Sequence, residues 1–167
     1  MTKFVRMAAL AAAATITATP AFAAPVSVTG GPVTATARIV KPLVLEKVAD
    51  MEFGTITVQD AGTATMDTAG AVLCSANLTC TGATTAAEYK VKGTNNQVVQ
   101  ITKPDVTLTN TDLSGTTLTL VLAGPNTYTI PNAGATGGNF TLGGSIAVAA
   151  SQRDGIYVGD LAVTVEY

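Results

Sequence analysis

The sequence has no histidine and no tryptophan, and only 12% of its residues are charged. Without histidine, the chain lacks the general base of a Ser-His or Cys-His nucleophile and the commonest metal ligand. Its two cysteines cannot fill a tetrahedral zinc site by themselves. No glycine-rich loop followed by Lys-Ser/Thr is present to hold a phosphate. We therefore expect no enzyme, metal or cofactor, and a carboxylate-pair glycosidase is the catalytic alternative.

Residues 1–23 have the layout of an export signal. Lys3 and Arg6 precede the apolar run 7–16, and Ala21 and Ala23 supply small residues for a cleavage site. The apolar run is too short to span a bilayer. A buried alanine-rich helix is the alternative interpretation. The order of these features predicts an exported chain whose mature part is residues 24–167.

The mature chain is sparsely and negatively charged. Removing Lys3 and Arg6 from the nine basic residues leaves seven against eleven acidic ones, a net charge of −4. No basic stripe is present, which argues against a nucleic-acid partner. No second apolar stretch has the length to span a membrane. Threonine, alanine, glycine and valine dominate, and this composition favours sheet over helix.

Cys74 and Cys80 are the only cysteines of the chain. An even number of cysteines in an exported protein predicts a disulfide. The bond would close a seven-residue loop, which stabilises the fold by roughly 2–2.5 kcal/mol in the chain-entropy model.

Short stretches of alternating apolar and polar residues run through the mature chain, bounded by Gly, Pro, Asn and Asp. This pattern predicts an all-β fold, an antiparallel sandwich of many short strands. The expected strands are 33–39, 43–46, 51–58, 63–67, 72–81, 88–92, 98–101, 117–122, 128–130, 140–148, 155–157 and 160–167.

The two ends of the mature chain differ in character. Residues 24–37 contain Pro25, Gly30, Gly31 and Pro32 but no cluster large enough for a core, so we expect an extended arm before a domain of residues 38–167. An alternating arm of this kind can add a strand to a neighbour's sheet. The last strand places alternate residues on one face, with Ala162, Thr164 and Glu166 on the other. The first face consists of Leu161, Val163, Val165 and Tyr167.

Three blocks of the sequence resemble the DUF4402 family, a group of exported bacterial proteins related to chaperone–usher pilins. They are Phe53-Gly54-Thr55-Ile56, the block from Gly155 to Leu161, and Val163-Thr164-Val165-Glu166-Tyr167. The arm at residues 27–33 also resembles the N-terminal extension of type 1 pilins, and the spacing of Gly155 and Tyr167 matches theirs. Type 1 pilins join their first two strands by a disulfide, whereas the cysteines here would close a local loop.

The resemblance implies an immunoglobulin-like sandwich that lacks its final strand. A periplasmic chaperone fills the gap first, and the arm of the next subunit replaces it with the help of an outer-membrane usher. We expect one parity of the arm to insert, because a strand shows one face to a groove; the even set Val26, Val28 and Gly30 is the alternative register. The expected inserting residues are Gly31, Val33, Ala35, Ala37 and Ile39, and the expected chaperone-facing residues are Leu161, Val163, Val165 and Tyr167.

The resemblance therefore implies a structural subunit of an adhesive extracellular fibre, a pilus, exported through the periplasm to the cell surface. The alternative is a monomeric extracellular or periplasmic binding module, for example for carbohydrate. Carbohydrate sites usually present exposed aromatic rings, and this chain has four tyrosines and no tryptophan. The aromatic content favours the fibre subunit.

Overall fold

The computed structural model describes residues 25–27, 29–132 and 136–167. The expected export signal, residues 1–23, lies outside the described residues. The chain divides into two units, with the boundary between Ala37 and Arg38. We describe each unit by itself.

The described residues of the first unit, 25–27 and 29–37, are all exposed and none belongs to a strand. Gly30 and Gly31 have positive φ angles of 104° and 97°, a conformation that glycine adopts without strain. The strand expected at 33–39 is therefore not formed in this structure. A single extended segment becomes a strand only when a neighbouring strand pairs its backbone groups.

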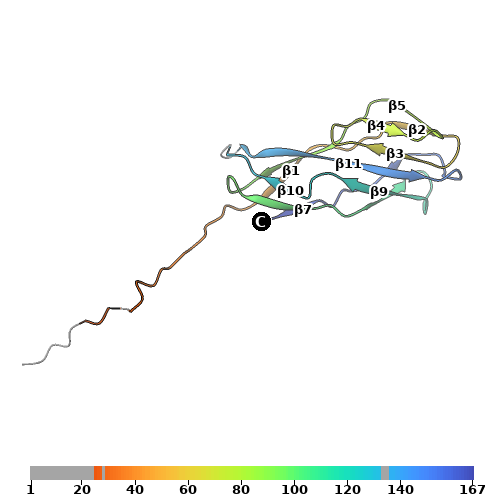
Figure 1. The fold of residues 1–167 in the computed structure, drawn as a ribbon. Coiled ribbons are helices and arrows are strands. Elements are labelled where there is room, and N and C mark those ends of the chain that lie inside the picture. Colours follow the sequence, from red (N-terminus) through yellow and green to blue (C-terminus); the bar gives the residue numbers. More distant parts are fainter. Residues whose placement is uncertain (1–24, 28, 133–135) are drawn as a thin grey trace, which may run out of the picture. The chain divides into compact units, whose positions relative to one another are not determined.

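The second unit is all-β, as the sequence predicts, and its paired strands are antiparallel (Figure 1). Its strands are β1 (Val44–Ala49), β2 (Thr55–Val58), β3 (Gly62–Met66), β4 (Val72–Cys74), β5 (Leu78–Thr81), β6 (Ala87–Lys92), β7 (Val98–Thr102), β8 (Val106–Asn110), β9 (Thr117–Ala123), β10 (Thr127–Thr129), β11 (Gly138–Val148), β12 (Tyr157–Val158) and β13 (Thr164–Glu166).

The long strand β11 connects the two halves of the domain (Figure 1). Its residues 138–142 pair with β6, and its residues 143–148 pair with β9 and β3. The largest sheet has the order β1-β6-β11-β9-β8-β12, with β3 and β4 beside β11. Two smaller sheets, β10-β7-β13 and β2-β5, complete the domain.

Two hydrophobic clusters form the core, one in each half. The first cluster consists of Ala64, Leu78, Val106, Leu108, Leu120, Leu122, Ile146 and Val148. The second consists of Ala87, Val91, Val99, Ile101, Ile130, Phe140 and Leu142. The alternation of these strands directs every second side chain inward, so the sequence period of two determines the core.

Asn110, at the end of β8, is the buried polar residue of the described chain, at 3% exposure. Its Oδ1 accepts hydrogen bonds from the backbone N–H groups of Asp112 (2.9 Å) and Leu113 (3.0 Å). Its Nδ2 donates to the carbonyl of Asp154 at 3.0 Å. Gly155 lies so close that an added Cβ would be 2.5 Å from Nδ2. Asn110 therefore joins the β8–β9 turn to the loop before β12.

We predict that Asn110→Ala lowers the free energy of unfolding by about 2–3 kcal/mol, because it removes the three hydrogen bonds of a buried side chain that joins two loops. Thermal unfolding of the purified protein measures the loss. Thr119→Ala on the exposed face of β9 is the matched control and should change stability by less than about 0.5 kcal/mol. Equal stability of the two variants would contradict the role assigned to Asn110.

Candidate assembly groove

Strands β1 and β13 each have one unpaired edge. Within the described part of the chain, β1 pairs only with β6 and β13 pairs only with β7. The unpaired backbone groups of such edges can accept another strand. Both edges belong to the half of the domain that contains the second hydrophobic cluster.

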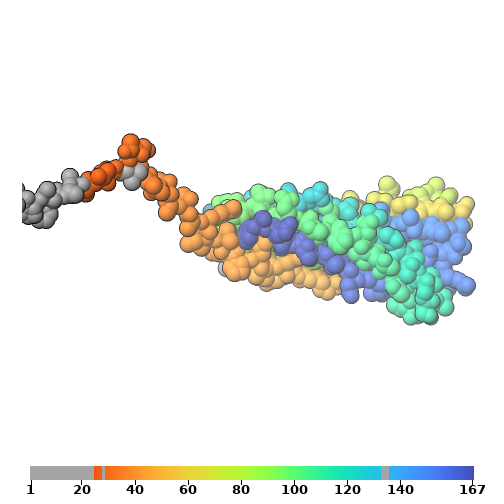
Figure 2. Space-filling view, turned by 90° about the horizontal axis from the view of Figure 1, so that it is seen from below, coloured from red at the N-terminus to blue at the C-terminus, as the bar shows by residue number. Residues whose placement is uncertain are grey.

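The inward-facing residues beside these two edges are half-buried, whereas those of the strands between them are buried. We call residues 43–58 the first edge segment and residues 157–167 the last edge segment. The half-buried apolar residues of the first are Leu43, Leu45, Met51, Phe53, Ile56 and Val58, and those of the last are Tyr157, Leu161, Val163 and Val165. All ten pack against the core clusters, yet the fully buried residues all come from other segments. The two edge segments run side by side, as the orange and dark blue atoms of Figure 2 show. The strip between them, here called the edge groove, contains core residues that are only half-buried.

One end of the edge groove is fixed by the hydroxyl of Tyr167. This hydroxyl accepts a hydrogen bond from the Thr94 N–H at 2.8 Å and donates one to the Lys41 carbonyl at 2.6 Å. The Lys41 N–H donates to Thr94 Oγ1 at 2.6 Å, and Arg38 donates to Gln97. Residues 38–41 and the end of the last edge segment are thus held together, and we call this the anchored end.

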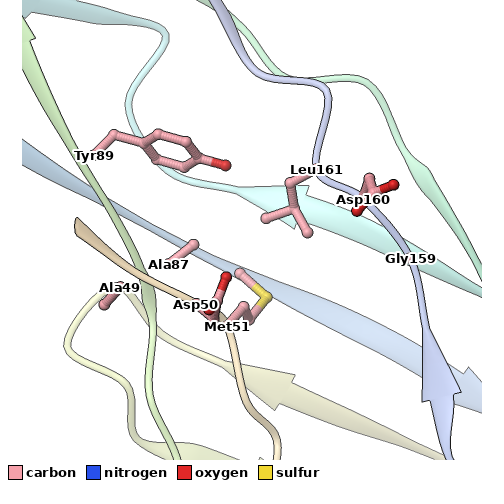
Figure 3. A pocket seen from close by; sticks show the side chains of 8 residues that line it. All are labelled: Ala49, Asp50, Met51, Ala87, Tyr89, Gly159, Asp160 and Leu161. Carbon is pink, nitrogen blue, oxygen red and sulfur yellow. The ribbon is translucent and has the colours of Figure 1, made fainter. Parts of the chain in front are cut away.

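A cavity of about 90 Å³ lies along the edge groove, between the two edge segments (Figure 3). Tyr89, Met51 and Leu161 project toward it, and Ala87 of β6 lies at its base. Tyr89 stacks on Phe140 with ring centroids 5.6 Å apart, which fixes the orientation of its ring. The complete lining is Ala49, Asp50, Met51, Ala87, Tyr89, Gly159, Asp160 and Leu161.

Charged groups stand at the rim of this cavity. Lys47 lies opposite Tyr89 in the β1–β6 register, which places it on the inward side, but its side chain is 65% exposed and bonds both carboxylate oxygens of Asp50 at 3.0 and 3.1 Å. Burial raises the pKa of the Tyr89 hydroxyl, the Asp50 charge raises this pKa further, and Lys47 opposes the rise. Tyr89 is therefore a neutral hydrogen-bonding group at physiological pH.

Strand β1 carries two features that discourage pairing at its free edge. Its register shifts between Lys47 and Ala49, as in a β-bulge. Lys47 also directs a charge to the inward side. Bulges and inward-pointing charges are the devices by which edge strands avoid unwanted partners. The register of β13 against β7 is regular from Thr164 to Glu166, so β13 is the better edge for an added strand.

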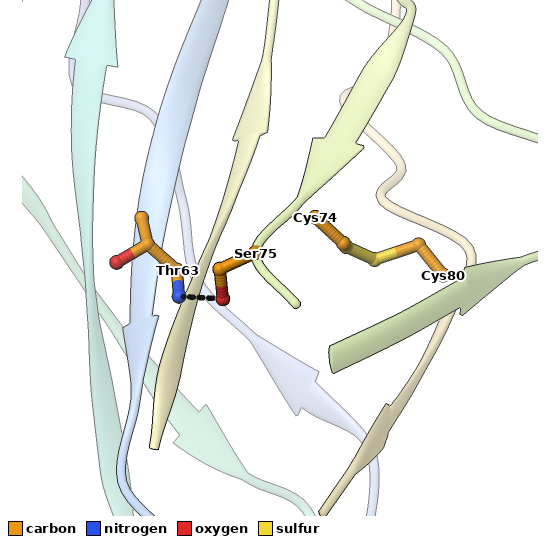
Figure 4. The surroundings of a disulfide bond; sticks show 4 residues. All are labelled: Thr63, Cys74, Ser75 and Cys80. Atoms are coloured by element: carbon orange, nitrogen blue, oxygen red, sulfur yellow. Dashed lines mark hydrogen bonds between the residues drawn. A yellow bond between two sulfur atoms is a disulfide. The ribbon is translucent and has the colours of Figure 1, made fainter. Parts of the chain in front are cut away.

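The disulfide predicted between Cys74 and Cys80 is present (Figure 4). It joins β4 to β5 with Cα atoms 6.1 Å apart. Both half-buried cysteines pack against the first core cluster, and Cys80 lies opposite Ile56 of β2. The Ser75 hydroxyl accepts a hydrogen bond from the Thr63 N–H at 3.0 Å beside the bond. The disulfide therefore connects the β3–β4 pair to the β2–β5 pair.

We predict that Cys74→Ser with Cys80→Ser lowers the free energy of unfolding by roughly 2–2.5 kcal/mol, the value for a loop of this length. Thermal unfolding measures this loss. Mass spectrometry of alkylated, non-reduced protein provides the companion test. Two labelled thiols in the exported wild type would show that the bond does not form in the cell.

The arm residues expected to insert into a neighbouring subunit fall in both units of the chain. Gly31, Val33, Ala35 and Ala37 lie in the first unit and Ile39 lies in the second, and all five are exposed. Ile39 is two residues from Lys41, which is bound at the anchored end. Val28 of the alternative register lies outside the described residues. Insertion of any of these residues into a partner stays a prediction.

The expected chaperone-facing residues lie along the last edge segment. Leu161, Val163 and Val165 are half-buried, while Tyr167 is 41% exposed with its hydroxyl bonded. Their role toward a chaperone stays a prediction. The sequence patterns did not indicate that the first edge segment forms the opposite side of the groove, and they did not indicate the cavity. The available signal for an inward face in the first edge segment was a shared parity. The apolar residues with odd numbers there are Leu43, Leu45, Ala49, Met51 and Phe53.

Among the residues that the structure describes, no group of three or more His, Cys, Asp or Glu side chains is placed to hold a metal ion. In the same residues, no helix combines the length and apolar character required to cross a membrane.

Comparison with known proteins gives a match to a family model. No curated protein and no solved structure matches the chain. The model of the family described as "Domain of unknown function (DUF4402)" matches residues 43–167, which include both edge segments of the groove. This match covers well over half of the sequence, and the chain therefore belongs to the DUF4402 family.

Proposed function

We propose that this protein is a structural subunit of an extracellular fibre, in which the N-terminal arm of one copy completes the sandwich of the next. The observation that carries the proposal is the edge groove. Two unpaired edges stand on either side of core residues that are only half-buried, and an added strand would cover those residues and pair an edge.

The strand order supports an immunoglobulin-like sandwich that lacks one strand. The order β1-β6-β11-β9 corresponds to strands A, B, E and D of the immunoglobulin fold. Strands β7 and β8 then correspond to C, and β13 and β12, which pair with them, correspond to F. In a complete immunoglobulin domain strand G pairs with the other edge of F. That edge of β13 is unpaired among the described strands.

Tyr157 supports the same assignment. It lies at the start of the last edge segment, and its hydroxyl donates to the Arg153 carbonyl at 2.7 Å while accepting from Gln152 Nε2 at 2.6 Å. A tyrosine at the start of strand F that bonds the backbone a few residues upstream is the tyrosine corner of immunoglobulin-like folds. The last edge segment is then strand F.

The arm has the length and composition of a donor strand. Residues 24–37 would extend about 46 Å at 3.3 Å per residue, and the last edge segment of 11 residues about 36 Å. The arm carries no charged residue, so it can enter an apolar groove without burying a charge. Each buried valine would contribute roughly 1.5–3 kcal/mol and each backbone hydrogen bond about 1 kcal/mol.

The proposed partners are other copies or related subunits, a periplasmic chaperone that first covers the groove, and an outer-membrane usher. The proposed location is the cell surface, reached through the periplasm after removal of the export signal, and the fibre would serve adhesion. These elements rest on the resemblance to chaperone–usher pilins and on the layout of residues 1–23.

Assembly is tested by a ladder of heat-sensitive oligomers on a denaturing gel of surface material from the protein's own host. Donor-strand joints resist detergent until heated, so unheated samples should show the ladder and boiled samples only the monomer. A wild type that stays monomeric at the surface would overturn the proposal in favour of a monomeric binding module.

A further inference from the structure

We propose that the cavity in the edge groove holds the side chain of Val33 from a second copy, whose arm runs antiparallel to the last edge segment, with Val33 opposite Leu161, three residues before β13. This inference rests on the proposed function and specifies the partner, direction and register of the same groove. It follows from the shape of the cavity, from the side chains of the arm and from the position of the anchored end.

The cavity suits one branched aliphatic side chain. Its volume of about 90 Å³ is several times the roughly 10–15 Å³ that one water molecule needs in the same measure. Methyl groups of Ala49 and Ala87 make the space, and Met51 and Leu161 provide apolar walls. Asp50 and Asp160 are exposed and stand at the rim. The exposed surface of the lining is more polar than apolar, so an aliphatic side chain would contact Met51 and Leu161 and leave both carboxylates toward water.

The arm offers one side chain of this kind in the expected parity. Among Gly31, Val33, Ala35 and Ala37, only Val33 extends beyond a methyl group. Ile39 has the right parity, but residues 38–41 are bound at the anchored end of their own domain by Gln97, Thr94 and Tyr167. Val33 therefore combines the required size with freedom to leave its own domain.

The anchored end sets the direction of the incoming arm. An arm parallel to β13 would bring its own domain to the anchored end, where residues 38–41 of the receiving copy already leave toward their arm. In that arrangement two copies would exchange arms and form a closed dimer. An arm antiparallel to β13 places its domain at the opposite end, so each copy receives at one end and donates from the other. Head-to-tail contacts of this kind do not close and produce a fibre.

Parity and direction then fix the register. Residues directly opposite in an antiparallel pair share a face, so odd arm residues meet the odd residues of the last edge segment. With Val33 opposite Leu161, Ala35 lies opposite Gly159 and Gly31 opposite Val163. Gly159 lies tightly against β8, where an added Cβ would be 2.7 Å from the Thr107 carbonyl oxygen, so a small partner suits this position.

Cysteine pairs test the register in the full chain. One copy carries Val33→Cys and a differently tagged copy carries Leu161→Cys, and both are co-expressed in the host with the native disulfide retained. We expect a disulfide between the two copies. Pairing Val33→Cys with Val163→Cys or Tyr157→Cys, two and four residues away, should reduce the product by at least about fivefold, because a disulfide tolerates only short Cβ separations.

A second test needs no new cysteines: it enlarges a side chain in the cavity wall and then shortens the side chain expected to enter the cavity. Ala49→Leu fills the cavity from its own wall and should reduce the oligomer ladder by at least about fivefold, since overfilling a packed site costs about 1–3 kcal/mol and 1.4 kcal/mol is tenfold. Adding Val33→Ala should restore part of the ladder, whereas adding Ala35→Gly should not. Wild-type assembly of Ala49→Leu would overturn the inference.

The outcomes separate this inference from the proposed function. A normal ladder with the strongest cross-link at Val163 or Tyr157 would refute the register and leave the fibre subunit standing. A strong cross-link from Val26→Cys to Leu161→Cys would assign the cavity to the even register and also refute Val33. A Val33→Cys/Leu161→Cys double variant cross-linked only within monomers would show that the arm fills its own groove, and both proposals would fail.

Discussion

Deleting residues 24–37 should abolish the ladder of heat-sensitive oligomers, and Val33→Asp alone should reduce it by about 100-fold or more. The aspartate would bring a third carboxylate, without a cationic partner, into the cavity that Asp50 and Asp160 already line between Met51 and Leu161. A buried charge without a partner costs about 3–5 kcal/mol, and each 1.4 kcal/mol changes an equilibrium about tenfold. The effect should appear at every joint of the proposed fibre, because each copy would insert the same residue.

The matched control is Thr34→Asp, which adds the same charge to the neighbouring residue on the outward parity. This variant should assemble, although beside Asp160 its ladder will weaken at low salt, where like charges repel more strongly. Both variants should yield folded subunits, since residues 33 and 34 are exposed and belong to no strand of their own chain. A Val33→Asp ladder as strong as that of Thr34→Asp would contradict insertion of Val33.

The strands were predictable wherever apolar residues alternate over five or more positions. β6, β9 and β11 follow the period-two pattern; β6 and β9 each bury side chains in one of the two clusters, and β11 contributes to both. β8 was missed, although Val106 and Leu108 alternate with threonines, because Pro104 and the polar residues around it indicate a loop. Its third inward position holds Asn110, whose burial depends on loops 2 to 44 residues away.

The groove could be predicted only on one side. Alternation from Leu161 to Tyr167 indicated an inward face, and the structure places the first three apolar residues of that series against the core. The sequence does not reveal that the first edge segment lies across from it, because this juxtaposition depends on pairings of β1 with β6 and of β13 with β7. The cavity depends on alanines at positions 49 and 87, which carry no distinguishing pattern by themselves.

The segment 33–39 shows why pattern alone does not produce a strand. Its alternation is as regular as that of β9, yet no residue of it is paired. Alternation describes which face a segment would bury, whereas a strand also requires an edge that accepts its backbone hydrogen bonds. The regular pattern of an unpaired segment is consistent with a partner edge on another molecule, which under the proposed function would be the groove of a second copy.

Removing Val165, Glu166 and Tyr167 should eliminate the protein as a stable species. The deletion takes away two of the three residue pairs between β13 and β7, the contact of Val165 with the second cluster, and the hydrogen bonds of the Tyr167 hydroxyl to Lys41 and Thr94. Loss of Val165 alone would cost about 1.5–3 kcal/mol, and each lost hydrogen bond about 1 kcal/mol. The sum approaches the total stability of a small domain, about 5–15 kcal/mol.

Two point variants distinguish this account from a general sensitivity of the C-terminus. Tyr167→Phe removes only the hydroxyl that bonds Lys41 and Thr94, and should lower the melting temperature by several degrees, equivalent to about 1–2 kcal/mol. Glu166→Gln changes an exposed side chain and should leave the melting temperature within about a degree of wild type. The yield of exported subunit and its thermal unfolding measure all three variants. A truncated protein that accumulates at wild-type levels would show that the edge of β13 is dispensable, and the groove would then lose the strand on which an incoming arm must pair.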